Sequence, residues 1–205
     1  MKKTLLGSFI LLTLVLSGCG DNHTHTHESS KSSESHVLTK AGDKTYDKSQ
    51  GNIQLLSVSN KSVSKNIDDV DYNISSVKLL KTEATNKNQE SRYETTFGDK
   101  WESPMKYIQV KYTLTNNTDH PIFIWGAGGI DGSGTQYDNN DGAHDSLQGK
   151  TLQPGAKMEG LLLYKATSLD KKNFDKEKMI TGLVDIKSGD RDIKTIEHAT
   201  IDLTK

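Results

Sequence analysis

The clearest pattern in the chain is an alternation of apolar and polar residues with a period of two. Apolar residues occupy the even positions from Ile108 to Leu114, and polar residues occupy the odd positions between them. Successive side chains of a β-strand point to opposite faces, so this alternation predicts a half-buried strand over residues 107–114. We expect Val110 to face a core and Lys111 to face solvent.

The same pattern predicts further strands on both sides of this one. Apolar residues alternate from Val70 to Ile74 and again from Val77 to Leu79. The phase slip at residues 75–76 indicates a β-bulge, where one extra residue shifts the alternation. The remaining predicted strands are residues 122–125, 158–164, 183–186 and 193–203, the last two joined by a hairpin turn at residues 188–190.

Helix signals are scarce, and one short helical turn is predicted over residues 168–178. Tyr93, Phe97 and Trp101 recur every four residues, which fits one face of either a strand or a helix. We expect these three aromatic residues to cover a sandwich edge as part of the core. The alternative is an aromatic platform that binds a sugar or a partner.

Six to eight short antiparallel strands separated by turns are typical of an all-β sandwich. Three segments, Tyr107–Ile122, Asp131–Tyr137 and Leu152–Tyr164, carry a more specific pattern. They resemble an uncharacterised family of immunoglobulin-like lipoprotein domains common in Gram-positive bacteria. Its pattern is a strand ending in Asn before a turn, then D-x-x-G-x-x-Y, then L-x-P-G-x-x-x-x-G. The resemblance covers residues 70–205 and implies an extracytoplasmic, immunoglobulin-like antiparallel β-sandwich, with no catalytic residues to carry over.

The N-terminal segment has a different character. Two lysines precede an apolar run from Leu5 to Leu16, which is shorter than the about 20 residues of a membrane span and typical of a secretory signal. The box Leu16-Ser17-Gly18-Cys19 resembles that of bacterial lipoprotein signals. The resemblance implies that the Cys19 thiol receives diacylglycerol and that cleavage follows Gly18. Acyl chains such as palmitate would then anchor the mature chain to the outside of the cell membrane. The alternative is an ordinary signal peptide with an incidental cysteine.

These features divide the chain into three parts: a signal peptide at residues 1–18, a flexible polar tether at 19–50 and the sandwich domain at 51–205. Within the tether, His23, His25 and His27 stand at alternate positions. In an extended chain their imidazoles share one side and can chelate Zn²⁺ weakly. The other interpretation is a solvated tether whose histidines bind nothing, because no cysteine or acid cluster completes a defined cage. Otherwise we expect no cofactor.

Composition narrows the function classes. With 26 basic and 27 acidic residues the formal charge is −1, so the chain lacks the concentrated basic character of a nucleic-acid-binding protein. A single cysteine excludes a disulfide framework and a cysteine-based zinc cage. Hydrophobic residues make up 32% of the chain, which is enough for one core.

Two loop segments resemble known binding motifs, but each lacks residues that the motif requires. The glycine-rich segment 125–134 lacks the Gly-Lys-Ser/Thr ending of a phosphate loop, so we expect a structural corner. Asp138, Asp141 and Asp145 have a calcium-like spacing, but Gly149 stands where the bidentate acid is needed, which favours an exposed acidic loop. The sequence contains neither Gly-x-Ser-x-Gly nor His-Glu-x-x-His, so we do not expect an enzyme.

The leading hypothesis is therefore a lipid-anchored extracytoplasmic binding or interaction module. Its partners would be the cell membrane, through Cys19, and an envelope protein or small ligand, with no nucleic acid. One alternative is a metal-capturing surface lipoprotein that uses the histidine tract. A further alternative is a cell-envelope hydrolase or its accessory protein.

Overall fold

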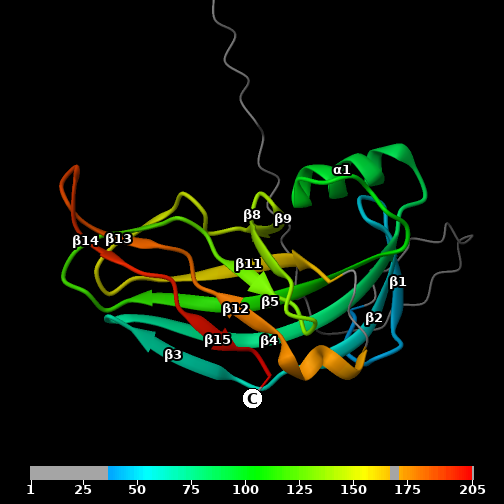
Figure 1. Cartoon of the computed structure of the whole chain (residues 1–205), viewed down its shortest axis with the longest axis horizontal. Coiled ribbons are helices and arrows are strands. Elements are labelled where there is room, and N and C mark those ends of the chain that lie inside the picture. Colours follow the sequence, from blue (N-terminus) through cyan, green and yellow to red (C-terminus); the bar gives the residue numbers. More distant parts are fainter. Residues whose placement is uncertain (1–36, 167–170, 205) are drawn as a thin grey trace, which may run out of the picture. The chain divides into compact units, whose positions relative to one another are not determined.

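The structure is a computed structural model that describes residues 37–166 and 171–204 (Figure 1). The predicted signal peptide, Cys19 and the three tether histidines, His23, His25 and His27, lie outside the described residues. In the described part of the chain, no helix combines the length and the apolar character that crossing a bilayer requires.

The described residues form fifteen strands, one α-helix and one 3₁₀-helix. The strands are β1 Lys44–Asp47, β2 Gly51–Ser59, β3 Val63–Ile67, β4 Val70–Glu83, β5 Met105–Asn116, β6 Ile122–Ile124, β7 Gly128–Ile130, β8 Gln136–Asn139, β9 Gly142–Asp145, β10 Thr151–Leu152, β11 Lys157–Lys165, β12 Lys178–Ile180, β13 Val184–Ser188, β14 Arg191–Ile196 and β15 Thr200–Asp202. The helices are α1 Lys87–Phe97 and η1 Lys171–Lys176.

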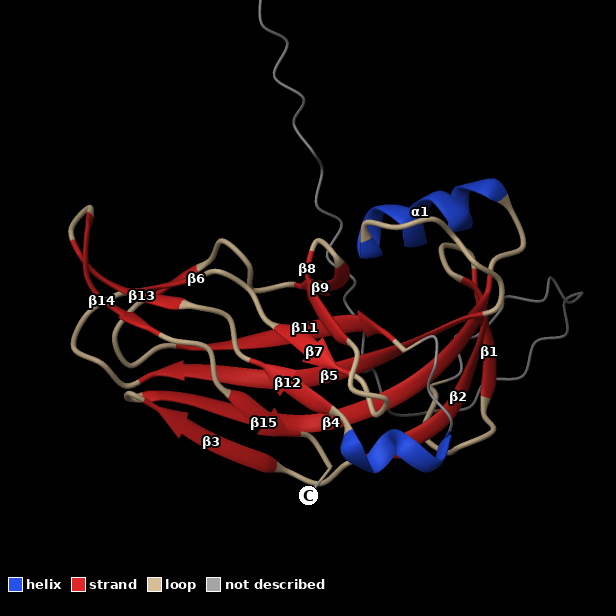
Figure 2. Cartoon of the chain, in the orientation of Figure 1, coloured by secondary structure: helices blue, strands red, loops and turns tan. Residues whose placement is uncertain are grey.

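The strands form two sheets that pack as a sandwich (Figure 2). The larger sheet has the order β1-β2-β4-β5-β11-β9-β8-β7-β12-β15, with β3 beside β4, and the smaller has the order β10-β6-β13-β14. Buried side chains of β4, β5 and β11 share one hydrophobic cluster with those of β6, β12, β13 and β15. The core therefore lies between these two groups of strands, which confirms the predicted all-β sandwich.

The central strand β5 confirms the alternation in the sequence. Val110 and Tyr112 are 0% and 1% exposed within the main cluster, whereas Lys111 between them is exposed. The predicted bulge is also present, because the pairing of β4 with β5 shifts register between Ile74 and Ser76. β13 and β14 form the predicted hairpin.

Helix α1 covers a second, smaller hydrophobic cluster, and two of the three evenly spaced aromatic residues, Tyr93 and Phe97, lie on it, whereas Trp101 follows its end. The Asn86 side chain accepts hydrogen bonds from two N–H groups of the first turn, and Gly98 ends the helix with a φ of 68°. Tyr93 and Phe97 are buried beneath α1, and Trp101 stacks on Tyr93 with ring centroids 4.8 Å apart. Tyr93 and Phe97 therefore belong to the core as expected, and the partly buried Trp101 packs against it.

The folded unit begins earlier than the predicted boundary at residue 51. β1 pairs with β2, and Leu38 packs against the second cluster while its carbonyl accepts a 2.9 Å hydrogen bond from Lys78 Nζ. Residues 38–50 therefore belong to the domain rather than to the tether. The polar sequence concealed β1 because an edge strand is held mainly by backbone hydrogen bonds to its one neighbour.

Two C-terminal predictions also need correction. The strand predicted over residues 193–203 is two strands, β14 and β15, which pair with β13 and β12 respectively. Between β14 and β15 the strand pairing is interrupted, and the backbone N–H of Thr181 donates a hydrogen bond to the carbonyl of Ala199 there. The helical turn predicted over residues 168–178 is the shorter η1, and Phe174 on it packs against the main core. Residues 168–170 of the predicted turn lie outside the described residues.

Candidate functional site

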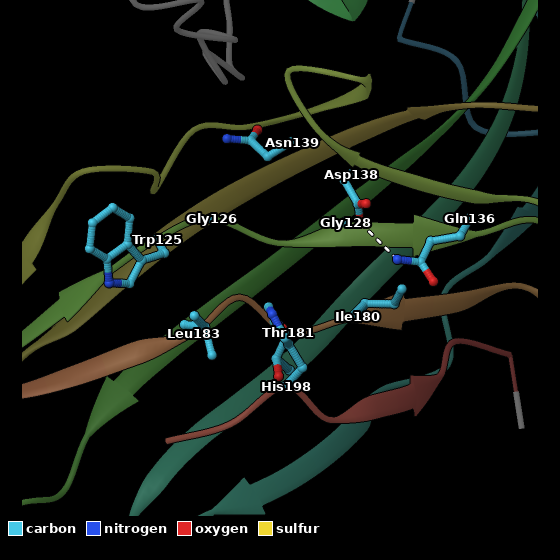
Figure 3. A pocket seen from close by; sticks show the side chains of 10 residues that line it. All are labelled: Trp125, Gly126, Gly128, Gln136, Asp138, Asn139, Ile180, Thr181, Leu183 and His198. Carbon is cyan, nitrogen blue, oxygen red and sulfur yellow. Dashed lines mark hydrogen bonds between the residues drawn. The ribbon is translucent and has the colours of Figure 1, made fainter. Parts of the chain in front are cut away.

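A cleft of about 340 Å³ opens where β6, β7, β8 and β12 end near the loop between β14 and β15. Trp125 and Gln136 lie toward opposite ends, with Thr181 and His198 between them (Figure 3). The lining residues are Trp125, Gly126, Gly128, Gln136, Asp138, Asn139, Ile180, Thr181, Leu183 and His198.

Trp125 is the most unusual of these residues because its large apolar side chain is 52% exposed. Its indole Nε1 donates a 2.6 Å hydrogen bond to Asp185 Oδ2, and its ring packs edge-to-face with Phe123 at 5.1 Å. Asp185 also accepts a 2.7 Å hydrogen bond from the Thr195 hydroxyl. Burial opposes ionisation of Asp185, but the hydrogen bonds from Trp125 and Thr195 outweigh it and lower the pKa of this carboxyl. The indole is therefore exposed and fixed in position.

Asn139 forms part of the cleft wall and has one unpaired donor. Its Oδ1 accepts a 3.0 Å hydrogen bond from the backbone N–H of Asp145, which orients the amide. Its Nδ2 is buried and has no hydrogen-bond partner in the part of the chain that the structure describes. Gly126 packs against this amide so closely that a Cβ there would lie 3.0 Å from Nδ2, and its φ of 98° also favours glycine. An unpaired buried donor costs about 1–3 kcal/mol.

The buried residue Asp145 contacts the cleft wall through Asn139, and its carboxylate is fully hydrogen-bonded. It accepts hydrogen bonds from the Tyr112 hydroxyl at 2.9 Å, the Ala127 N–H at 2.8 Å and the Leu147 N–H at 3.1 Å. Burial outweighs these hydrogen bonds and raises the pKa of Asp145. At 2% exposure Asp145 belongs to the core, so the prediction that it lies in an exposed acidic loop is wrong.

His198 closes the cleft on the side of the β14–β15 loop. Its Nδ1 lies 2.7 Å from the carbonyl oxygen of Thr181. A carbonyl only accepts hydrogen bonds, so Nδ1 is the donor in this contact. The Thr181 hydroxyl accepts a 2.9 Å hydrogen bond from Ala199 N–H, which fastens the same loop to the end of β12.

A second buried carboxylate, Glu177, lies outside the cleft. It is 0% exposed and accepts hydrogen bonds from the Tyr164 hydroxyl at 2.7 Å and the Gly132 N–H at 2.9 Å. Burial raises the pKa of Glu177 to about 7, and the nearby Asp131 carboxyl adds to this effect. Because no part of Glu177 reaches solvent, we assign it a structural role.

The glycine-rich segment predicted as a corner contributes Gly126 and Gly128 to the cleft. Close packing, rather than positive φ alone, requires glycine here, since a Cβ on Gly129 would lie 2.4 Å from the Tyr164 ring. Of the predicted acidic loop, Asp138 and Asp141 are exposed as expected. Within residues 37–166 and 171–204, no group of three or more His, Cys, Asp or Glu side chains is placed to hold a metal ion.

Sequence reasoning placed Trp125 at the end of a strand but did not identify it as a site residue. A signal was present: in Ile122-Phe123-Ile124-Trp125 the alternation puts the two aromatic residues on the face opposite the two buried isoleucines. Thr181, Asp185 and His198 carry no such signal, because only the sheet pairing brings them near Trp125.

No protein-family model and no curated protein matches the chain. Among solved structures, a functionally unknown protein from Listeria monocytogenes EGD-e is 15% identical, the match covering 63% of this chain and 74% of that one, with a TM-score of 0.45. The yjhA protein from Bacillus subtilis is 13% identical over 68% of this chain and 95% of that one, with a TM-score of 0.43. A conserved hypothetical protein from Bacillus anthracis is 17% identical over 69% of this chain and 96% of that one, with a TM-score of 0.37. Similarities at this level carry no functional assignment.

Proposed function

We propose that the protein is a lipid-anchored extracytoplasmic module that binds a small polar ligand in the cleft beside Trp125. The observation that carries this proposal is an indole that is half exposed and yet held in place by Asp185. A fixed aromatic surface offers contact area without the entropy cost of ordering a mobile side chain.

The rest of the cleft is suited to recognition of a polar molecule. Gln136, Asp138, Asn139 and His198 supply hydrogen-bonding groups around an opening lined in part by Ile180 and Leu183. A few polar groups on a partly apolar wall are the usual composition of a ligand site. Asp138 is the one carboxylate and His198 the one imidazole among the lining residues, a set that supports binding more than hydrolysis.

The anchoring part of the proposal rests on the sequence. The complete box Leu16-Ser17-Gly18-Cys19 after a basic and apolar segment supports lipidation at Cys19. The segment resemblances between Tyr107 and Tyr164 support assignment of the sandwich to the immunoglobulin-like lipoprotein domains. Together they favour a domain held at the outer face of a bacterial cell membrane.

Retention of small molecules by the immobilised protein tests the binding function. The protein without residues 1–19 is incubated with the low-molecular-mass fraction of an envelope extract, and retained compounds are identified by mass spectrometry. We expect at least one compound to be retained by the unsubstituted protein and by Tyr46→Ala, but not by Trp125→Ala. Tyr46 is a matched control, because it is 43% exposed and does not line the cleft. Equal retention by all three proteins would refute the proposal.

A further inference from the structure

We infer that the ligand of the cleft is a neutral saccharide whose pyranose ring stacks on the indole of Trp125. This inference rests on the proposed binding function and specifies its chemical class. Three properties of the cleft support it: the exposed aromatic face, the absence of Lys and Arg among the described lining residues, and the arrangement of polar groups at the end away from Trp125.

The aromatic face favours a ring with aligned C–H bonds. One face of a pyranose presents several C–H groups, whose partial positive charge is attracted to the negative face of an indole. Trp125 keeps half of its surface exposed and is fixed through Nε1, so binding a ligand does not require ordering of the indole. An apolar ligand would need a deeper apolar pocket than one whose rim carries Gln136 and Asp138.

The charges around the cleft select against anions. None of the described lining residues is Lys or Arg, whereas Asp138 lines the cleft and Asp185 accepts a hydrogen bond from the indole. Lys187, which packs over Phe123 at 5.3 Å, is ion-paired with Asp192. A phosphate or carboxylate ligand would need the charge-assisted donors of Lys or Arg, which do not occur among the described lining residues. This favours a neutral saccharide over a nucleotide, a sugar phosphate or an acidic sugar.

The polar end of the cleft matches the hydroxyl groups of a sugar. Gln136 Nε2 donates a 2.9 Å hydrogen bond to Asp138 Oδ1, so a planar amide and a carboxylate lie side by side in solvent (Figure 3). Such a pair can engage neighbouring hydroxyl groups that both donate and accept. In the wall beside Gly126, the buried Asn139 Nδ2 has no acceptor among the described residues. The volume of about 340 Å³ lies at the lower end of ligand sites and suits one or two sugar rings.

Fluorescence titration of a single-tryptophan protein tests this inference. The chain has two tryptophans, so Trp101→Phe in the protein without residues 1–19 leaves Trp125 as the only reporter. The probes are three neutral tetrasaccharides, built from N-acetylglucosamine, glucose or galactose units. We expect at least one to change the Trp125 emission with a Kd of about 1 mM or lower. Calorimetry uses the protein that retains Trp101. In it, Trp125→Ala should weaken this binding at least tenfold, and Tyr46→Ala should leave it unchanged.

Two comparison probes separate the failure of this inference from the failure of the binding function. A tetrasaccharide of galacturonic acid units should bind at least tenfold more weakly than the best neutral probe, and equal or tighter binding would overturn the selection for neutral sugars. If an uncharged dipeptide amide shifts the Trp125 emission and no tetrasaccharide does, the saccharide is wrong and the binding site stands. If no probe binds and envelope compounds are retained equally by the unsubstituted protein and Trp125→Ala, both proposals fail.

Discussion

The indole Nε1 of Trp125 donates a hydrogen bond of 2.6 Å to Oδ2 of Asp185, sixty positions further along the chain. The same carboxylate accepts a hydrogen bond from Thr195, so a single side chain on β13 ties the end of β6 to β14. The exposed aromatic surface of the cleft is thereby held against the small sheet, directly after the end of β6.

Loss of the Asp185 carboxylate should release the indole. Asp185→Ala removes the acceptor of Trp125 and Thr195, so we expect a free energy of unfolding lower by about 1–3 kcal/mol. We also expect lower fluorescence anisotropy of Trp125 in the Trp101→Phe background. Thr195→Val is the matched control, because it removes the other hydrogen bond and leaves the indole in place. Unchanged anisotropy in Asp185→Ala would show that the hydrogen bond does not fix the ring.

Glu177 should make the stability depend on pH. Its pKa of about 7 in the folded state lies above its ordinary value of 4.5. Between these pH values the folded protein binds a proton that the unfolded chain has released, so stability falls as pH rises from about 4.5 to about 7 and then levels off. The fall attributable to this group is up to about 3 kcal/mol.

The substitution Glu177→Gln isolates this effect. Glutamine resembles the protonated acid, because its amide can donate to Tyr164 while its oxygen accepts from Gly132. We expect urea unfolding between about pH 5 and pH 8 to show a smaller fall in stability for Glu177→Gln than for the unsubstituted protein. Parallel stability curves for the two proteins would contradict the raised pKa.

The two faces of β5 should respond differently to the same new charge. Val110→Asp places an unpaired carboxylate at a position that is 0% exposed and should cost about 3–5 kcal/mol. Lys111→Asp changes an exposed side chain whose ion pair with Glu159 is also exposed, and should cost less than about 1 kcal/mol. Thermal unfolding compares them, and equal loss of stability would mean that the face assignment is wrong.

Lipidation can be tested at its proposed nucleophile. Cys19→Ala removes the sulfur to which diacylglycerol would be transferred, so we expect loss of palmitate labelling and accumulation of an uncleaved precursor. Ser17→Ala keeps a small residue in the box and serves as the control that remains labelled. Fatty-acid labelling of Cys19→Ala at the unsubstituted level would refute the anchor.

The tether histidines should bind Zn²⁺ weakly and only when neutral. Their affinity should fall as pH drops below about 6.5. The melting temperature of the domain should barely change if the tract belongs to the predicted tether and not to the domain. Calorimetry at about pH 7.5 and 5.5 compares protein beginning at Gly20 with protein beginning at Val37, since β1 must be kept. Equal heats from both proteins would exclude His23, His25 and His27 as ligands.

The sequence predicted the strands whose two faces differ in polarity. On β5 the alternation from Ile108 to Leu114 was sufficient to predict the strand and its buried face, because one face meets the core and the other is exposed or half-buried. The alternation disappears where both faces are covered: Leu79 and Leu80 are adjacent in sequence and both buried, one in each cluster. The position of the helix was likewise hidden, because α1 is mostly polar and buries mainly Gln89, Tyr93 and Phe97.

The cleft was beyond prediction for a different reason. Its residues come from the ends of β6, β7, β8 and β12 and from the β14–β15 loop, and several of these elements are distant in sequence. Asp145 looked like part of a hydrophilic loop because its neighbours in sequence are polar. What buries it is Tyr112 on β5, and that contact follows from the pairing of β9 with β11 and not from any local pattern.

The contact between Asp145 and Tyr112 limits how freely the cleft can change. The Asp145 carboxylate accepts hydrogen bonds from the buried Tyr112 hydroxyl and from the Ala127 N–H. The backbone N–H of Asp145 in turn orients the wall residue Asn139. Substitutions at the wall that alter ligand preference therefore act on the interior of the sandwich as well. Variation that leaves the core undisturbed is available mainly at the rim, where Trp125, Gln136 and Asp138 meet solvent. A change of specificity in this scaffold is accordingly expected to begin at those rim positions.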